Sequence, residues 1–332
     1  MEAGEPTLNS LPSPETFEAA QHRLLSLQRQ LEGVLVGQQA LIRDLLTALF
    51  AGGHVLIEGL PGLGKTALAR SMASLLGLRG ARVQCTPDLL PADISGAEVL
   101  EAGGGFSFRP GPVFAQLLLV DEINRATPRT QSALLEAMQE GQVTAGGQTH
   151  ALPRPFCVIA TQNPIELEGT YPLPEAQLDR FLFKLQMPTP TREVLLGVLA
   201  VSLDGEPSDA LQAQLDPEAV LALMALARRQ LVGERCRAAA VDLVMATQPG
   251  GDSGPQRHLR YGASPRALQA LVRAARVRSL FEGRPHVDID DLAAVALPVL
   301  RHRVLLRLDS ELDGLSTESL LVELIEAWRR RA

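Results

Sequence analysis

The strongest chemical signal in this sequence is the segment Gly59 to Thr66, which reads GLPGLGKT and matches the phosphate-loop pattern G-x-x-x-x-G-K-[ST] at every fixed position. An apolar run of strand length, 54–58, precedes it, and the helix-forming run 67–73 follows it. Glycines without a Cβ let backbone N–H groups converge on phosphates, and the start of a helix adds partial positive charge. A glycine-rich turn is the alternative, but the two flanks favour a nucleoside triphosphate site.

Within this segment Lys65 is expected to reach the β and γ phosphate oxygens, and the Thr66 hydroxyl is expected to ligate Mg²⁺. The sequence therefore predicts a nucleotide carried as its magnesium complex. The residues expected to surround its phosphates are Pro61, Gly62, Leu63, Gly64, Lys65, Thr66 and Ala67.

Two carboxylates, Asp121 and Glu122, follow the apolar run 117–120. Acidic residues often end strands as solvated turn formers, so this pair taken by itself says little. The phosphate loop changes the interpretation, because ligands of an open parallel sheet bind outside the carboxyl ends of its strands. We therefore expect Asp121 to hold Mg²⁺, and Glu122 to orient and deprotonate the attacking water.

Two further residues could meet a phosphate. Asn163 follows the apolar run 156–160, where its amide can hydrogen-bond the γ-phosphate or the attacking water; a turn before Pro164 is the alternative. Arg266 follows a good helix start, Ser264-Pro265, where the helix dipole disfavours a cation. An anionic ligand at that helix end explains Arg266 better than chance placement on the surface.

The composition describes a globular protein of 332 residues, 46% hydrophobic and 21% charged, whose abundance of Leu and Ala with only 4% aromatics favours helices around a modest sheet. Its three distant cysteines suggest neither disulfides nor a zinc site. Without a leader segment or a run of about 18 apolar residues, a cytoplasmic location without membrane insertion is expected. The net charge of −7 disfavours nucleic acid as the default partner.

Along the chain, residues 1–15 are expected to be a disordered tail, 16–190 an α/β nucleotide-binding core with a parallel sheet, and 191–332 a smaller helical domain. Two glycine-rich segments, 96–108 and 141–152, read as hairpin insertions in the core. The second turns at Gly146-Gly147, and an ordinary connecting hairpin explains it as well as a moving one does. Both lead into strands that carry predicted site residues.

Taken together, these residues resemble the AAA+ ATPases, and the match narrows to the MoxR group, which belongs to the clade with an insertion in helix 2. The similarity covers roughly Phe17 to Leu308, leaving the tail after Leu308 outside it. The segments that carry the resemblance are Val36-Gly37-Gln38, 58–66, 86–91, 109–112, 121–126, 160–164, 173–181 and 262–266.

The resemblance implies an ATPase with a helical lid, assembled as a ring, usually a hexamer, with ATP and Mg²⁺ at the subunit junctions. By this analogy Val36 and Gly37 flank the adenine, and Asn163 and Arg266 are the two sensors. Arg180 is the arginine finger that reaches the neighbouring subunit's ATP.

The family also implies a chaperone-like remodeller of a client protein or complex, in maturation or metal-cofactor insertion, often beside a protein with a von Willebrand factor A domain. Two other functions remain open. One is a nucleotide-gated scaffold with little turnover, which the set Asp121, Glu122, Asn163 and Arg180 disfavours. The other is a nucleic-acid motor or transcription activator of related architecture, which the acidic charge and the lack of a basic stretch interleaved with aromatics disfavour.

Overall fold

The computed structural model describes residues 13–35, 37–59, 64–101, 104–164, 169–188, 190–192, 194–196, 199, 211–251 and 254–332. These residues form two compact units. One extends from Gln28 to Leu221, and the other comprises Ala222–Ala332 together with the N-terminal residues up to Leu27. The helices α1 (Pro14–Val34) and α8 (Pro217–Arg228) cross the two boundaries between the units.

The first unit is built on a parallel sheet of five strands in the order β2-β5-β8-β1-β9. This confirms the predicted α/β class with a parallel sheet. The strands are β1 (Val55–Glu58), β2 (Gly80–Gln84), β5 (Leu117–Asp121), β8 (Cys157–Gln162) and β9 (Phe183–Gln186). Because β1, β5 and β8 lie in the middle of the sheet, their carboxyl ends, where the predicted site residues lie, are adjacent.

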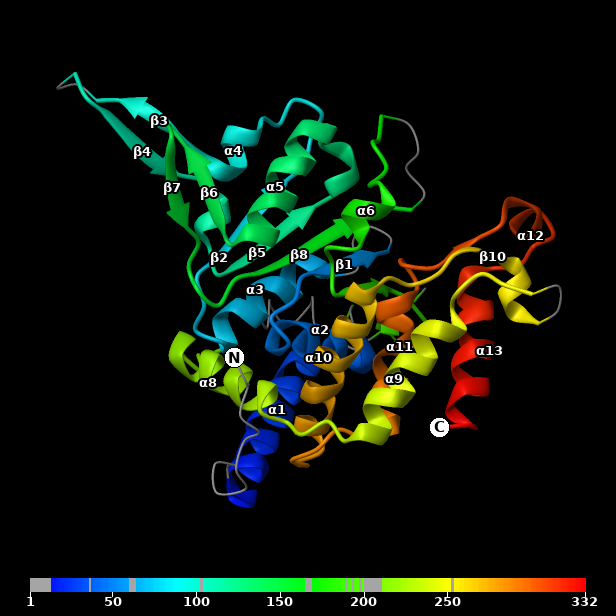
Figure 1. The fold of residues 1–332 in the computed structure, drawn as a ribbon. Coiled ribbons are helices and arrows are strands. Elements are labelled where there is room, and N and C mark those ends of the chain that lie inside the picture. Colours follow the sequence, from blue (N-terminus) through cyan, green and yellow to red (C-terminus); the bar gives the residue numbers. More distant parts are fainter. Residues whose placement is uncertain are drawn as a thin grey trace, which may run out of the picture. The chain divides into compact units, whose positions relative to one another are not determined.

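Helices cover both faces of this sheet, as its continuous apolar strands require. Figure 1 shows α4 (Pro91–Ser95) and α5 (Pro128–Glu140) on one face, with α2 (Gln39–Phe50) and α3 (Lys65–Leu75) on the other. The side chains of β5 alternate between the two faces: Leu118 and Val120 pack in one cluster with Leu134 and Leu135 of α5. All five residues of β5 are buried, so the strand positions its last residue, Asp121, rigidly.

Both predicted insertions are antiparallel hairpins. The first pairs β3 (Gly96–Leu100) with β4 (Phe106–Pro110), and the second pairs β6 (Gln142–Ala145) with β7 (Gln148–Ala151). The two hairpins contact each other, since the ring of Phe108 stacks on His150 with centroids 3.9 Å apart. The remaining short elements of this unit are the 3-10 turns Pro112–Phe114 and Ile123–Arg125 and the helix α6 (Glu175–Leu178).

Among its described residues, the second unit is mainly helical and contains one short pair of antiparallel strands, β10 (Leu259–Tyr261) and β11 (Leu305–Leu306). The pair departs from the expectation that everything after the sheet domain is helical. Leu259 and Leu306, both buried, pair within it and add to the core of the unit. The helices are α9 (Glu234–Ala246), α10 (Pro265–Phe281), α11 (Ile289–Leu300), α12 (Leu308–Leu312) and α13 (Thr317–Arg329).

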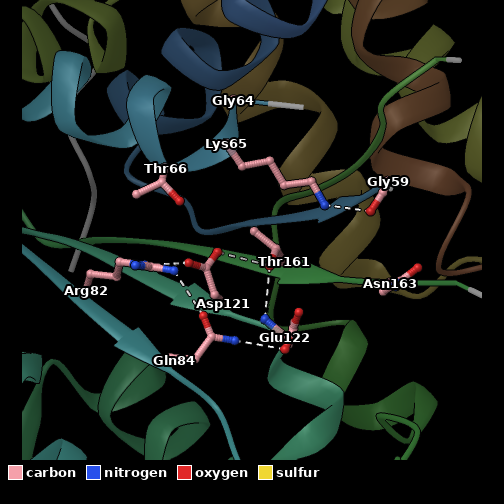
Figure 2. Close-up of a pocket in the computed structure, with 10 residues that line it drawn as sticks. All are labelled: Gly59, Gly64, Lys65, Thr66, Arg82, Gln84, Asp121, Glu122, Thr161 and Asn163. Atoms are coloured by element: carbon pink, nitrogen blue, oxygen red, sulfur yellow. Dashed lines mark hydrogen bonds and ion pairs between the residues drawn. The ribbon is translucent and has the colours of Figure 1, made fainter. Parts of the chain in front are cut away.

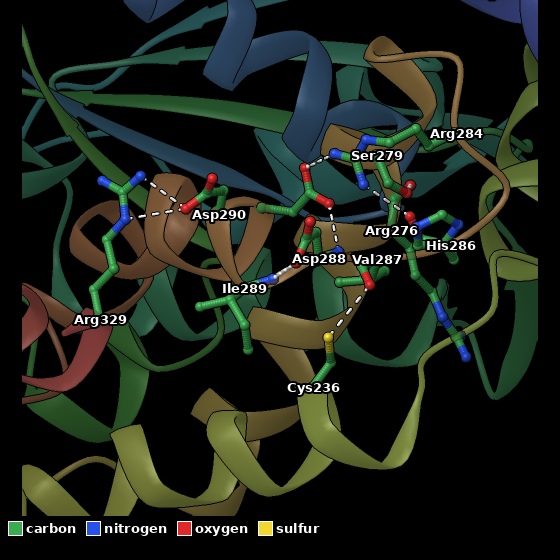
Figure 3. Close-up of polar contacts among 11 residues, drawn as sticks. Cys236, Arg276, Ser279, Arg284, His286, Val287, Asp288, Ile289, Asp290 and Arg329 are labelled. Atoms are coloured by element: carbon green, nitrogen blue, oxygen red, sulfur yellow. Dashed lines mark hydrogen bonds and ion pairs between the residues drawn. The ribbon is translucent and has the colours of Figure 1, made fainter. Parts of the chain in front are cut away.

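The start of α11 is the most polar part of this unit, and Figure 3 shows its contacts. Asp288 caps the helix by accepting the Ile289 N–H at 2.7 Å, and Asp291 accepts the Asp288 N–H at 2.8 Å, which completes a capping box. Arg284 pairs with the buried Asp291 at 2.7 Å, and the Cys236 thiol donates to the Val287 carbonyl at 3.3 Å. These contacts anchor α11 to the preceding loop and to α9.

No helix in the described part of the chain has the length and apolar character needed to span a bilayer.

Candidate nucleotide site

A cavity of about 210 Å³ lies at the carboxyl edge of the parallel sheet, where the ends of four strands and the start of α3 meet. Its lining residues come from segments up to about a hundred residues apart in the sequence, and Figure 2 shows them converging. They are Gly59, Gly64, Lys65, Thr66, Arg82, Gln84, Asp121, Glu122, Thr161 and Asn163.

The phosphate loop forms the part of the cavity next to α3. Gly64 has φ +78°, and a Cβ there would lie 2.9 Å from a methyl group of Leu35, so glycine suits both the backbone and the space. The Lys65 ammonium donates to the Gly59 carbonyl at 2.6 Å. Burial lowers the pKa of Lys65, while the negative charges of Asp121 and Glu122 act in the opposite direction. This side chain is therefore a partly desolvated cation near two carboxylates that line the same cavity.

Asp121 is held on two sides. One carboxylate oxygen pairs with Arg82 Nε at 2.7 Å, and the other accepts from the Thr161 hydroxyl at 3.3 Å. The Asp121 side chain is 10% exposed, whereas Arg82 is 53% exposed. The carboxylate is therefore fixed at the cavity wall, and its arginine partner reaches it from a more open position.

Glu122 has an unusual backbone. Its φ of +55° makes it the one residue other than glycine with a positive φ among the described residues. Such a conformation costs about 1 to 3 kcal/mol, and here the Glu122 N–H donates to the Thr161 hydroxyl at 3.0 Å. The turn directs the Glu122 side chain into the cavity beside Asp121 instead of onto the opposite face of the sheet.

Two donors hold the Glu122 carboxylate in this structure. Gln84 Nε2 donates to Oε2 at 2.8 Å, and Arg125 pairs with the same oxygen at 3.3 Å. Gln84 Oε1 in turn accepts from Arg82 Nη2 at 3.0 Å. The contacts therefore form one continuous chain from Asp121 through Arg82 and Gln84 to Glu122 (Figure 2).

Arg82, Gln84 and Thr161 were missed in the sequence analysis. Their signal depends on strand pairing: residues 82 and 84 share one face of β2, and Gln84 lies opposite Asp121 in the register. Once β2 and β5 are known to be neighbours, polar residues at alternate positions near the end of β2 point to the same site. The sequence by itself does not say which strands are neighbours.

The residues fit a magnesium ion. Thr66 and Asp121 offer a hydroxyl and a carboxylate to one cavity, and such hard oxygen ligands suit Mg²⁺. In the described parts of the chain there is no cluster of three or more His, Cys, Asp or Glu that could hold a metal by protein ligands alone. Mg²⁺ usually keeps several waters and binds through one or two protein oxygens plus substrate phosphates. Two protein oxygen ligands therefore match its usual coordination.

Among the other predicted residues, the structure brings Asn163, buried at 8% exposure, to the cavity with the carboxylates. Gly37 and Ala67 are not among the lining residues; Gly37 has φ +75°, and a Cβ there would lie 2.4 Å from a methyl group of Val194. Four of the predicted residues lie outside the described part of the chain, namely Val36, Pro61, Gly62 and Leu63.

The two predicted arginines lie elsewhere. Arg180 does not line the cavity; its guanidinium donates to the Leu135 carbonyl at 3.1 Å and to the Gln139 side chain, both on α5. Arg266 lies in the first turn of α10, where its N–H donates to the Ser264 hydroxyl at 3.2 Å. Arg266 belongs to the second unit.

Comparison with known families agrees with this geometry. Residues 54–183 match the model of the ATPase family associated with various cellular activities (AAA), and residues 255–323 match an AAA lid domain. The chain is thus an AAA protein with a lid. The lid match extends beyond Leu308, so the expectation that the family similarity ends there was wrong. The match ends within α13, and beyond it Trp328 of the same helix is buried and donates to the Ala239 carbonyl at 2.8 Å.

Similar proteins identify the family within the AAA ATPases. It is 40% identical to chaperone MoxR1 of Mycobacterium tuberculosis, over 94% of this chain and 83% of that protein. It is 34% identical to protein MoxR of Methylorubrum extorquens, over 84% and 86% of the two chains. A crystal structure of a candidate ATPase from Cytophaga hutchinsonii superimposes with a TM-score of 0.86 at 36% identity, covering 94% of this chain and 96% of that one. This chain belongs to the MoxR family of AAA ATPases.

The family assignment confirms the resemblance seen in the sequence. It makes the chain a nucleotide-binding ATPase with a chaperone-like role.

Proposed function

We propose that the cavity hydrolyses ATP as its magnesium complex, with each lining residue in the role that its position allows. Thr66 and Asp121 would hold Mg²⁺, which neutralises charge on the phosphate oxygens when bound. Lys65 would bind the β and γ phosphates, Glu122 would take a proton from the attacking water, and Asn163 would orient that water or the γ-phosphate. The observation that carries this proposal is the convergence of all five side chains on one cavity.

Glu122→Gln tests the chemical role. The amide keeps the shape of the side chain but is a far weaker base, so the variant should bind ATP normally and hydrolyse it about a hundredfold more slowly. The matched control is Glu323→Gln, an exposed glutamate of α13, which should retain wild-type turnover. Wild-type hydrolysis by Glu122→Gln under saturating ATP would remove Glu122 from this role. Barely detectable turnover by the wild type would instead favour the nucleotide-gated scaffold.

We further propose that the chain works as a ring, most simply a hexamer, with Arg180 serving the ATP site of a neighbouring subunit and Arg266 sensing nucleotide. The position of Arg180 supports this role. Its guanidinium is held on α5 and does not line the cavity of its own chain. A residue so placed would reach a phosphate from outside, across a subunit junction, as arginine fingers do.

The substrate we propose is another protein, remodelled during complex maturation or metal-cofactor insertion, with a von Willebrand factor A domain protein as the expected partner. The first hairpin supports a protein contact, because Val99, Leu100 and Phe106 are 42%, 63% and 71% exposed at its tip. A cluster of exposed apolar side chains on a projecting hairpin is typical of an interaction surface. The second hairpin packs beside it through His150 and Phe108.

A trap experiment tests the client. Glu122→Gln with ATP should hold client and nucleotide together, and mass spectrometry of the captured protein should identify a von Willebrand factor A domain. Adding Leu100→Ser and Phe106→Ser to the trap should abolish client capture. The same two substitutions in the protein with native Glu122 should leave ring assembly and basal hydrolysis intact. The control is Leu312→Ser, at a leucine that is 78% exposed in the second unit. Capture that persists without the apolar tip would argue against the hairpin as the docking surface.

A further inference from the structure

His54 lies immediately before β1, at the edge of the sheet opposite the nucleotide cavity, and both of its ring nitrogens are hydrogen-bonded. The Val158 N–H of β8 donates to Nδ1 at 3.0 Å, and Nε2 lies 3.1 Å from the Met138 carbonyl in the last turn of α5. Because a backbone N–H only donates and a carbonyl only accepts, the ring is the neutral tautomer with its proton on Nε2. His54 therefore joins β8 to the end of α5.

The last turn of α5 also holds the guanidinium of Arg180. Its Nη1 donates to the Leu135 carbonyl at 3.1 Å and to the Gln139 side chain, while its buried Nε has no hydrogen-bond partner among the described residues. The orientation of the guanidinium therefore depends on the position of this turn. Both bonds use Nη1, so Nη2 can donate to an oxyanion while Arg180 keeps its place on α5.

The backbone of His54 fixes the chain just after Arg180. The Leu182 N–H, two residues further on, donates to the His54 carbonyl at 2.8 Å, where β1 and β9 begin to pair. The ring supplies a partner for the Met138 carbonyl, which lies where helix carbonyls lack partners within the helix. One residue thus contacts both supports of the arginine: the turn that holds its guanidinium and the segment that continues its backbone.

We infer that His54 is a positioning residue for Arg180, which it holds in place for the ATP site of the neighbouring subunit. The inference rests on the role proposed above for Arg180. The bond from the His54 ring to Met138 lies on α5, which carries the guanidinium, and not on the phosphate loop. Loss of this bond should therefore slow hydrolysis at the site of the neighbour and not at the site of the same chain.

Two amide substitutions separate the two ring contacts of His54. An asparagine side chain extends about as far as Nδ1, so it can still accept from the Val158 N–H but does not reach the Met138 carbonyl. A glutamine side chain extends about as far as Nε2 and can donate to that carbonyl. His54→Asn should therefore loosen the last turn of α5, whereas His54→Gln should retain it.

The test places His54→Asn in either partner of a mixed ring. Lys65→Ala subunits supply an intact Arg180 without a working pocket, and Arg180→Ala subunits supply the pocket, so hydrolysis requires a junction that combines the two. His54→Asn in the Lys65→Ala subunit should lower steady-state hydrolysis about tenfold, since even a 1 Å misplacement of a catalytic group can cost about a hundredfold. The same substitution in the Arg180→Ala subunit should change hydrolysis by less than about twofold, because that subunit contributes only its pocket.

Controls separate positioning from folding. A fluorescent, non-hydrolysable ATP analogue should bind the Arg180→Ala subunit equally well with His54 or with His54→Asn. His54→Gln in the Lys65→Ala subunit should keep hydrolysis within about threefold of the unmodified mixture, because its bond to α5 can persist. The matched control is His22→Asn, at an exposed histidine of α1, which should have no effect in either subunit.

Gln139→Ala tests the same turn of α5 from its exposed side, so a folding defect in His54→Asn does not decide the outcome. It removes one acceptor of Arg180 and should lower hydrolysis about threefold, again only from the Lys65→Ala subunit. Its matched control is Gln142→Ala, at an exposed glutamine of β6.

Equal losses from the two placements, for both His54→Asn and Gln139→Ala, overturn the inference and leave His54 a structural residue. A mixture of Lys65→Ala and Arg180→Ala subunits that does not hydrolyse ATP even with native His54 overturns the proposed role of Arg180 itself, and the inference with it. The two failures are therefore distinguishable.

Discussion

Each of the two units contains a pair of neighbouring acidic residues with an arginine beside it, and the two clusters use the same residue types for opposite purposes. At the start of α11, Asp288 and Asp291 accept hydrogen bonds from backbone N–H groups one and three residues away in the sequence, and Arg284 donates to Asp291. At the end of β5, the carboxylates of Asp121 and Glu122 accept instead from side chains, which come from other strands or from the turn after Glu122.

This difference distinguishes a cluster that stabilises the fold from one that can bind a ligand. Acidic oxygens committed to the backbone cannot change partners without unwinding the helix start, so the α11 cluster stabilises the fold. Oxygens held by long side chains at a cavity can exchange those partners for a metal, a water or a phosphate. The positive φ of Glu122 adds a conformational cost that is not repaid by any helix cap.

The largest effect on turnover should come from Arg180. Its hydrogen bonds to α5 resemble those of a structural arginine, but its proposed role is at the ATP site of a neighbouring subunit. Arg180→Ala should bind ATP yet lose turnover by about 10³-fold or more, since arginine fingers supply roughly 10³ to 10⁵. Steady-state hydrolysis and analogue binding measure the two properties. Mixing Arg180→Ala with Lys65→Ala should restore some hydrolysis at junctions that combine an intact pocket with an intact Arg180. Turnover that is independent of protein concentration, with no rescue on mixing, would make Arg180 a structural residue after all.

Lys65→Ala should separate binding from stability. Losing a charge-assisted contact should weaken ATP binding by about 1.5 to 3 kcal/mol, which calorimetric titration measures. The melting temperature of the nucleotide-free protein should not fall. Burial lowers the Lys65 pKa in the folded chain, so at neutral pH the ammonium opposes folding, and this cost disappears only as the pH rises toward the ordinary value of 10.5. A clear drop in melting temperature would mean that the Lys65 contact to Gly59 outweighs desolvation.

Much of the site follows from contiguous segments: the phosphate loop, the Asp-Glu pair and Asn163 each adjoin an apolar strand in the sequence. The parallel sheet could be predicted for the same reason, because its three central strands, β1, β5 and β8, begin as apolar runs in the sequence. Arg82, Gln84 and Thr161 could not be predicted, since their roles depend on the order β2-β5-β8 and its register. The Asp288 and Asp291 cap is local in sequence but becomes distinguishable from a ligand site only when its oxygens are seen to face the backbone.

Substituting Asp291 and Asp121 should have opposite effects: the first substitution should mainly lower folding stability, and the second should mainly alter nucleotide binding. Asp291→Ala removes part of a capping box and leaves Arg284 without its closest carboxylate, so it should destabilise folding by about 2 to 4 kcal/mol. Affinity for the ATP analogue should remain near wild type. Asp121→Ala should retain most of its stability but lose the magnesium enhancement of nucleotide binding. Thermal unfolding and analogue titration of both variants check the contrast, and equal destabilisation by the two substitutions would contradict it.

The smallest effect concerns the thiols that lie beside the two acidic clusters. Burial, with the charges of Asp121 and Glu122, raises the pKa of Cys85 to about 12. Burial and Asp288 also raise the pKa of Cys236, but there Arg235 and Arg284 act in the opposite direction. Because the thiolate is the reactive form and a raised pKa keeps the thiol protonated, both should alkylate slowly at pH 8, and Cys85 more slowly than Cys236.

Labelling with iodoacetamide followed by peptide mass spectrometry measures both rates in one sample, with Cys157, whose pKa burial raises to about 12, as an internal reference. All three thiols should react rapidly in urea, since all are free and buried only in the folded chain. Asp121→Asn removes one of the charges that disfavour the Cys85 thiolate, so it should speed labelling of Cys85 and leave Cys236 unchanged. If Cys85 instead labels at the rate of Cys236 in the wild type, its thiol does not experience the two carboxylates at the end of β5, and the contrast between the clusters loses its electrostatic basis.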